Sequence, residues 1–138
     1  MKLLIEHGAR VDASSNTHSS SLHAVSLAGQ IEVIRLLLEL GASVDKETDT
    51  GCIPLHLAAR NGHVDAMKLL IEHGSIVDAQ SIDEFTPLHA GALDGHVEAI
   101  RLLLELGVGV DNQTNTGCTA LHLVAQNGHV GALNVLIE

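Results

Sequence analysis

The sequence contains no tryptophan, no tyrosine and a single phenylalanine, although 46% of its 138 residues are hydrophobic. Its core must therefore be built from leucine, isoleucine, valine and alanine, a mixture typical of short helices that pack closely together. A chain of this length buries roughly two thirds of the surface that its unfolded form exposes, so it can form a core without disulfides or a metal.

Basic residues are also scarce: seven lysines and arginines stand against seventeen aspartates and glutamates, and none follows Arg101. The formal charge of −10 argues against binding to nucleic acid or to an anionic membrane, and it favours a protein partner that is basic or polar.

No secretory leader is found and no apolar run approaches the ~18 residues of a spanning helix, so we expect no membrane insertion and a cytoplasmic location. The two cysteines are too few for a disulfide framework and are expected to be reduced thiols.

What the sequence does have is an internal repeat of 33 residues, visible in one set of histidines and two sets of glycines. The histidines are His23, His56, His89 and His122. The glycines are Gly29, Gly62, Gly95 and Gly128, and Gly8, Gly41, Gly74 and Gly107. A stronger period of 66 lies on top, since MKLLIEHG at Met1 returns unchanged at Met67. A fixed period of this length is the signature of a stacked repeat protein.

Each unit is predicted to begin with a short helix. In the third complete unit the Thr86 hydroxyl can cap the helix, Pro87 suits its first position, and residues 88–94 supply about two turns. Gly95 then ends this helix, because a positive φ costs glycine nothing.

A second helix is predicted over residues 97–106, because apolar residues recur there at helical spacing and Gly107 follows. Residues 108–119 are too polar for a core helix and are expected to form a hairpin-like loop.

The segments TPLHA at Thr86, PLHLAARNGHV at Pro54 and LLLELGASVD at Leu36 resemble ankyrin repeats over essentially the whole chain. The resemblance implies an all-α ankyrin-repeat solenoid, in which antiparallel helix pairs stack in a row and hairpin loops project from it. It also implies a protein-binding scaffold that is not an enzyme and that carries no cofactor. The histidines of the TPLH motif are then structural, bonding to a neighbouring loop and to the threonine hydroxyl.

The register divides the chain into one domain over residues 1–138. It gives a partial repeat over 1–16, full repeats over 17–49, 50–82 and 83–115, and a partial repeat over 116–138.

Several residues depart from the family pattern. His18 and Glu84 stand where a glycine with positive φ is usual, at a cost of roughly 1 kcal/mol each if the turn is kept. Ile53 cannot cap its helix as threonine does, which costs about 1 kcal/mol. Gly91 and Val124 replace a small helical alanine.

The echoed cysteines and histidines raise the question of a metal or thiol site, with Cys52, His56 and His63 as one set. Zinc needs four ligands in tetrahedral closure, and this spacing crosses a predicted helix break. A catalytic group also occurs once per site, whereas these histidines occur once per repeat. We therefore expect no metal, no cofactor and no catalytic residue.

Partners of such arrays usually contact the hairpin tips and the exposed side of the first helices. Carried over by position, the candidate partner-binding residues are Asp49, Thr50, Cys52, Arg60, Asn61, Ile82, Asp83, Phe85, Leu93, Asp94, Asn115, Cys118, Gln126 and Asn127. The first unit contributes Asn16, Thr17, Ser19, Leu27 and Ala28, and the fourth also Thr116.

Phe85 is the most specific of these candidates, because aromatic anchors dominate many interfaces. It stands at a loop position expected to face outward, with Ile82 beside it and Leu93 on the adjacent helix face. The alternative is that Phe85 folds down and covers its own hairpin.

The interpretation is a non-catalytic scaffold that binds a partner through the hairpin tips and the concave face of the first helices. One alternative is a self-assembling unit that stacks head to tail through its uncapped terminal half repeats. Another is an artificial or reconstructed repeat protein without a natural partner, given the near-perfect 66-residue echoes.

Overall fold

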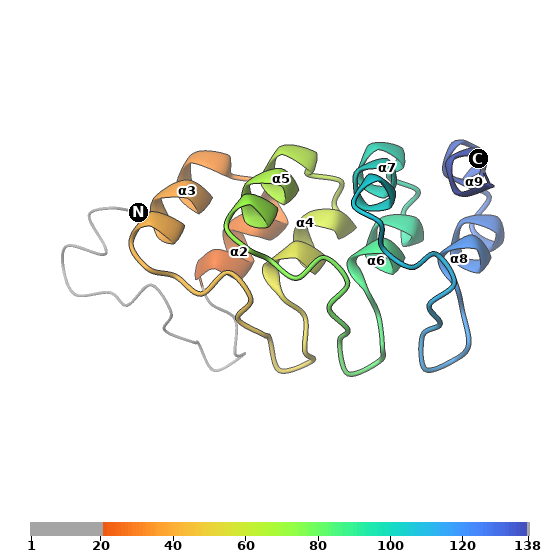
Figure 1. Cartoon of the computed structure of the whole chain (residues 1–138), viewed down its shortest axis with the longest axis horizontal. Helices are drawn as coiled ribbons and strands as arrows, with labels where there is room; N and C mark the ends of the chain where they lie inside the picture. The colour runs from red at the N-terminus through yellow and green to blue at the C-terminus, as the bar shows by residue number, and fades with distance from the viewer. Residues whose placement is uncertain (1–20, 138) are drawn as a thin grey trace.

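The computed structural model describes residues 21–137, and within this range every regular element is an α-helix. The helices form four antiparallel pairs that stand in a row (Figure 1). In chain order they are α2 (Ser21–Ala28), α3 (Ile31–Glu39), α4 (Pro54–Arg60), α5 (Val64–Glu72), α6 (Pro87–Leu93), α7 (Val97–Glu105), α8 (Ala120–Gln126) and α9 (Val130–Ile137).

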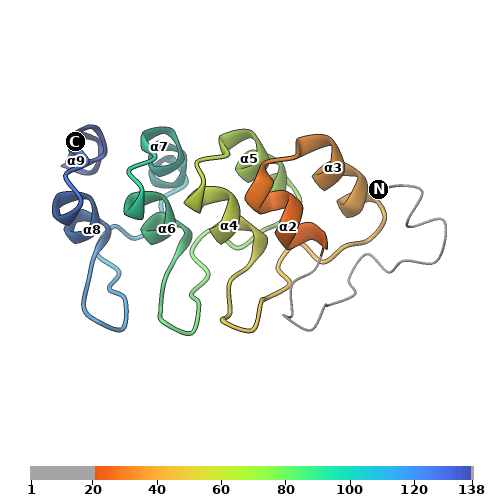
Figure 2. The same cartoon turned by 180° about the vertical axis from the view of Figure 1, so that it is seen from behind.

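The pairs build two layers of helices. The first helices α2, α4, α6 and α8 contact one another in sequence, and so do the second helices α3, α5, α7 and α9. Between successive pairs the chain runs out in long loops that all project from the same side of the row, beside the first helices (Figure 1, Figure 2). The structure is therefore the all-α solenoid of stacked helix pairs that the repeat predicts.

The ends of α6 and α7 lie within one residue of their predicted positions. Thr86 caps α6 by accepting a hydrogen bond from the backbone N–H of His89, and Pro87 is the first helical residue. The first helix ends at Leu93 and not at Asp94, and the second ends at Glu105, since Leu106 is its C-cap. The glycines that follow have the positive φ expected of a helix terminator, +68° at Gly95 and +82° at Gly107.

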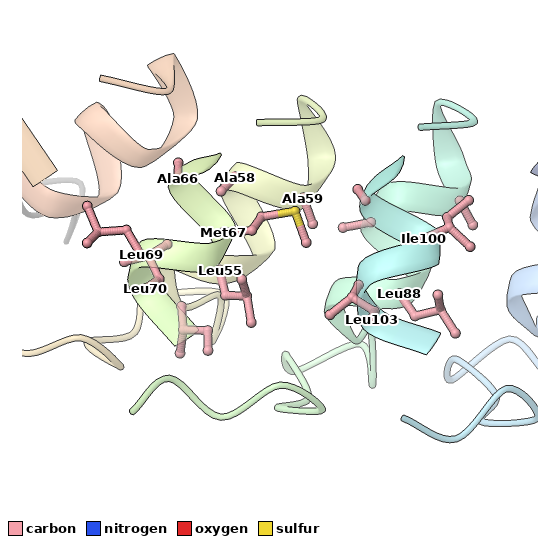
Figure 3. Packing of buried hydrophobic residues seen from close by; sticks show 14 of the residues in the cluster. Leu55, Ala58, Ala59, Ala66, Met67, Leu69, Leu70, Leu88, Ile100 and Leu103 are labelled. Carbon is pink, nitrogen blue, oxygen red and sulfur yellow. The ribbon is translucent and has the colours of Figure 1, made fainter. Parts of the chain in front are cut away.

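The core lies within each pair and between neighbouring pairs. Leu55, Met67, Leu70, Ile100 and Leu103 are all buried to within 1% of complete burial. Figure 3 shows Leu55, Met67 and Leu70 gathered where α4 meets α5, next to the pair formed by α6 and α7. Because each pair contributes to a core shared with its neighbours, no pair can bury its apolar surface alone.

The departures from the family pattern occur as the sequence indicates. Glu84 has a φ of +61° and is the one residue other than glycine with a positive φ among residues 21–137. Ile53 makes no side-chain cap to α4 but is buried in the core. Gly91 and Val124 are both buried as well. The fold thus tolerates these substitutions without changing its backbone plan, while His18 lies outside the described residues.

The outer side of α8 and α9 is more exposed than the equivalent side of the other pairs. Leu121 is 41% exposed, whereas its equivalents Leu55 and Leu88 are at most 2% exposed. Val130 and Ile137 are 67% and 64% exposed. A side chain at Gly128 would meet nothing within 4 Å, although a histidine ring from the next pair covers each of the three equivalent glycines.

Candidate functional site

The projecting loops are hairpins closed by short hydrogen bonds. In the loop before α4, Thr48 N–H donates to the Cys52 carbonyl at 2.8 Å, and Gly51 N–H donates to the Thr48 carbonyl at 2.9 Å. The loop before α6 repeats this pattern, with Ser81 N–H donating to the Phe85 carbonyl at 2.9 Å. These bonds fix the hairpin tips relative to the helices that follow them.

Neighbouring hairpin tips are also joined to each other. Ile82 N–H donates to the Thr50 carbonyl at 3.0 Å, and Asn115 N–H donates to the Asp83 carbonyl at 2.9 Å. The Asn115 amide side chain also donates to the Asp83 carboxylate at 3.2 Å. The tips therefore form a continuous edge whose residues are held in place before any partner arrives.

Buried histidines attach these loops to the helices. His56 Nδ1 accepts from Ile53 N–H at 3.0 Å, so the proton is on Nε2, which donates to the Phe85 carbonyl at 2.9 Å. His89 repeats the arrangement, with Nδ1 accepting from Thr86 N–H and Nε2 donating to the Asn112 carbonyl at 2.8 Å. The neutral ring in one tautomer thus satisfies one buried backbone N–H and one partly buried backbone carbonyl at once.

Burial lowers the pKa of His23, His56 and His89 below the ordinary value of 6.5. Hydrogen bonds to backbone carbonyls raise the pKa of each ring in part, but the loss of hydration is the larger effect. These histidines are therefore neutral at neutral pH. Their hydrogen bonds to neighbouring loops give them the structural role that the resemblance implies.

The hairpins before α4 and α6 and the two helices enclose a hollow of about 260 Å³. Its lining combines the hairpin residues with the exposed side of α4 and α6. It comprises Thr50, Cys52, His56, Leu57, Arg60, Ser81, Asp83, Phe85, Ala90 and Leu93. A second hollow of about 430 Å³ lies between the hairpin before α4 and helix α2, and it shares Thr50, Cys52, Leu57 and Arg60 with the first. Together the two hollows, called the groove below, run across three neighbouring first helices.

The structure brings half of the candidate binding residues together in this groove and leaves the rest outside it. Those in the groove are Asp49, Thr50, Cys52, Arg60, Asp83, Phe85 and Leu93. Those that do not line it are Asn61, Ile82, Asp94, Asn115, Cys118, Gln126 and Asn127. Of the first-unit candidates, Leu27 lines it, and Asn16, Thr17 and Ser19 lie outside the described residues.

Asn61 and Asn127 have a structural contact that the sequence did not suggest. The Asn61 side chain donates to the Leu27 carbonyl at 2.8 Å, and Asn127 donates to the Leu93 carbonyl at 3.0 Å. Each bond joins the end of one first helix to the preceding one. These two amides therefore stabilise the stack.

Of the two alternatives for Phe85, the structure is nearer to the one in which it covers its own hairpin. Its side chain is half-buried against the core, and its ring centroid lies 5.3 Å from that of His89 at an interplanar angle of 47°. It nevertheless lines the groove. Phe85 thus covers part of its own repeat while it also lines the hollow, and the His56 side chain holds its backbone by donating from Nε2 to the Phe85 carbonyl.

Seven residues that line the groove are absent from the candidate set: His23, Ala24, Thr48, His56, Leu57, Ser81 and Ala90. For three of them a signal was present in the sequence. Ala24, Leu57 and Ala90 each lie three residues before a candidate residue, Leu27, Arg60 and Leu93, and therefore share its helix face.

In the range that the structure describes, ion pairs occur on the second helices but not among the charged residues of the groove. Among residues 21–137 the two ion pairs are Arg35 with Glu32 at 3.3 Å and Arg101 with Glu98 at 3.8 Å, both within second helices. In the described part of the chain, Arg60 and the carboxylates of the hairpin tips form no ion pair.

Residues 21–137 also contain no group of three histidine, cysteine or acidic side chains placed to hold a metal ion. Cys52 and Cys118 are free thiols, each accepting a long contact of 3.7 Å from a threonine hydroxyl. No helix in the described range is long and apolar enough to cross a membrane.

Comparison with known families agrees with this geometry. A family model for ankyrin repeats matches in three overlapping copies, over residues 1–81, 22–114 and 76–138. The chain therefore belongs to the ankyrin repeat family, whose members are generally protein-protein interaction modules. The comparison with curated proteins finds no match.

Proposed function

We propose that this chain is a non-catalytic scaffold that binds a segment of a partner protein in the groove, between the hairpin tips and the first helices. The observation that carries the proposal is the convergence of variable residues on one hollow. The second and third repeats differ at three equivalent positions, with Asp83 for Thr50, Phe85 for Cys52 and Leu93 for Arg60, and all six residues line the same 260 Å³ space.

The fold supports a binding role because the groove is rigid before binding. Backbone hydrogen bonds join the hairpin tips, and His56 fixes the backbone of Phe85. A surface that is already ordered loses little conformational entropy when a partner binds. The free thiols of Cys52 and Cys118 support action in a reducing compartment such as the cytoplasm.

The repeats themselves supply substitutions that test this proposal without disturbing the fold. Serine occupies the position of Phe85 in the first unit, and glutamine occupies the position of Leu93 in the fourth. The variant Phe85→Ser/Leu93→Gln should therefore fold. For the tightest binder selected from displayed natural protein segments, we expect it to weaken binding at least about tenfold, as measured by titration calorimetry.

The matched control is Ile76→Ser, because Ile76 is 53% exposed and lies away from the groove. This control should change the affinity less than about threefold. If Phe85→Ser/Leu93→Gln binds as tightly as the control, the groove is not the binding surface.

The outer side of α8 and α9 supports self-association as a second candidate function. Leu121, Val130 and Ile137 expose apolar surface there, whereas their equivalents in other pairs are buried or partly buried. Light scattering over a hundredfold range of concentration tests this candidate. A constant monomer mass contradicts it, and a mass that rises with concentration and falls in Val130→Glu supports it.

A further inference from the structure

The hairpins and first helices carry a larger excess of acidic side chains than the second helices do. On the hairpin and first-helix side, the acidic residues are Asp45, Glu47, Asp49, Asp78, Asp83, Glu84, Asp94 and Asp111, and the basic residues are Lys46 and Arg60. On each of α3, α5 and α7 a basic residue stands between two acidic ones, and two of these basic residues form ion pairs. The larger part of the uncompensated negative charge therefore lies on the side of the groove, since α3, α5 and α7 each keep only one acidic residue in excess.

Two of these carboxylates stand at the groove itself. Asp83 lines the first hollow and Asp49 lines the second. Asp83 is held in place because both its carbonyl and its carboxylate accept hydrogen bonds from Asn115. Neither carboxylate has a cationic partner among the described residues. A carboxylate that is already oriented attracts a cation with little loss of side-chain entropy.

The floor between these carboxylates is apolar. Leu57, Phe85, Ala90 and Leu93 line the first hollow. Its volume is about 260 Å³, and it is continuous with the second hollow of about 430 Å³, so an extended segment can place one side chain in the first hollow and continue along the second.

From this arrangement we infer that the partner segment is basic and carries an apolar anchor. Its apolar side chain enters the hollow against Phe85 and Leu93, and lysine or arginine residues on either side face Asp49 and Asp83. This inference rests on the proposed function and adds the chemistry of the partner. An acidic segment would have only Arg60 to pair with and would meet the remaining negative field of the surface.

The inference is tested with a library of random 12-residue peptides displayed on phage and selected on the intact protein. We expect the enriched peptides to carry lysine or arginine beside a leucine, isoleucine, methionine or aromatic residue. Replacing that apolar residue by serine in an enriched peptide should weaken binding at least about tenfold, because charge attraction alone is sequence-independent. Enriched peptides that are acidic or neutral, or no enrichment at all, would overturn the inference.

A charge-matched pair of variants separates the groove carboxylates from the overall charge. Asp49→Asn/Asp83→Asn should lower the affinity for the selected peptide about tenfold at low salt. Asp65→Asn/Glu39→Gln removes the same charge from α5 and α3 and should weaken it less than about threefold. Equal losses in the two variants would show that only the net charge matters and would overturn the inference.

The same peptides distinguish this inference from the proposed function. Acidic or neutral peptides that lose affinity in Phe85→Ser/Leu93→Gln would leave the groove as the binding site and refute the basic partner. Peptides of any charge that bind Phe85→Ser/Leu93→Gln unchanged would refute the groove itself.

Discussion

The second and third complete repeats, residues 50–82 and 83–115, have the same helices, hairpins and buried histidines but depart from the family pattern at different positions. The second keeps Gly51 in its hairpin and lacks a capping hydroxyl at Ile53. The third keeps the cap at Thr86 but has Glu84 at φ +61° and Gly91 inside a helix. The two repeats therefore share one backbone plan but differ in their helix cap, in their hairpin turn and in the residues that line the groove.

The largest expected effect concerns a part that the two repeats share. His89→Ala should lower the free energy of unfolding by about 3 kcal/mol, because it removes a buried ring and leaves the buried Thr86 N–H and the partly buried Asn112 carbonyl without this partner. His56→Ala should cost a similar amount. His122→Ala is the control and should cost less than about 1 kcal/mol, since His122 is exposed. Urea unfolding measures all three, and equal costs at His89 and His122 would contradict the structural role.

The same histidines should make stability depend on pH. Because burial lowers the folded-state pKa of His23, His56 and His89, the unfolded chain takes up protons first as the pH falls. Their contribution is complete above pH 6.5 and is lost as the pH decreases from there toward the folded-state pKa. Within that window, each histidine can lower the free energy of unfolding by up to about 1.4 kcal/mol for every pH unit that the pH falls.

Urea unfolding at pH 8, 7, 6 and 5 measures this dependence. In His89→Gln the loss between pH 7 and 5 should be smaller, since glutamine has no ring to protonate. Unchanged stability of the parent protein between pH 7 and 5 would refute the neutral-histidine account.

A reciprocal exchange tests the helix defect of the third repeat. Gly91→Ala should raise the free energy of unfolding by about 1 kcal/mol, because alanine has the higher helix propensity. There is room for the methyl group, whose nearest neighbours would be Ala99 Cβ at 3.6 Å and Ile100 Cγ1 at 3.7 Å. Ala58→Gly, the reverse change in the second repeat, should lower it by at least as much. Thermal melting checks both. If Gly91→Ala were destabilised, the packing around α6 would require a glycine at position 91.

The smallest effect is expected in the hairpin of the third repeat. Glu84→Gly should stabilise the protein by up to about 1 kcal/mol, because glycine adopts the positive φ without steric cost. Gly51→Ala is the counterpart, and its methyl group would lie 3.0 Å from Ile82 N, so it should destabilise. Both variants are compared by their melting temperatures. Destabilisation by Glu84→Gly would indicate that the Glu84 side chain makes a compensating contact.

Most of the frame could be predicted from the sequence, because helix caps, glycines and apolar spacing are local signals. The ends of α6 and α7 lie within one residue of the predicted positions, and the strained turn at Glu84 follows from the glycine that it replaces. The sequence left Phe85 open between facing outward and covering its own hairpin, because the contacts of its ring with His89 and the core depend on tertiary packing.

The hollow itself could not be predicted from the sequence either. Its floor at Leu57 and Ala90 exists because α4 and α6 leave space beside the hairpins, and only the stacking of neighbouring repeats creates that space. Periodicity identifies which side a residue occupies, but it does not show where that side is hollow.

The most direct test of binding in the groove uses the two native thiols. Cys52 lines the groove and Cys118 does not, yet both are half-buried and contact a threonine hydroxyl at 3.7 Å. Their alkylation rates are measured by mass spectrometry with and without a saturating selected peptide. We expect the peptide to slow alkylation of Cys52 at least about tenfold and to leave Cys118 within about twofold. Equal protection of both thiols, or of neither, would contradict binding in the groove.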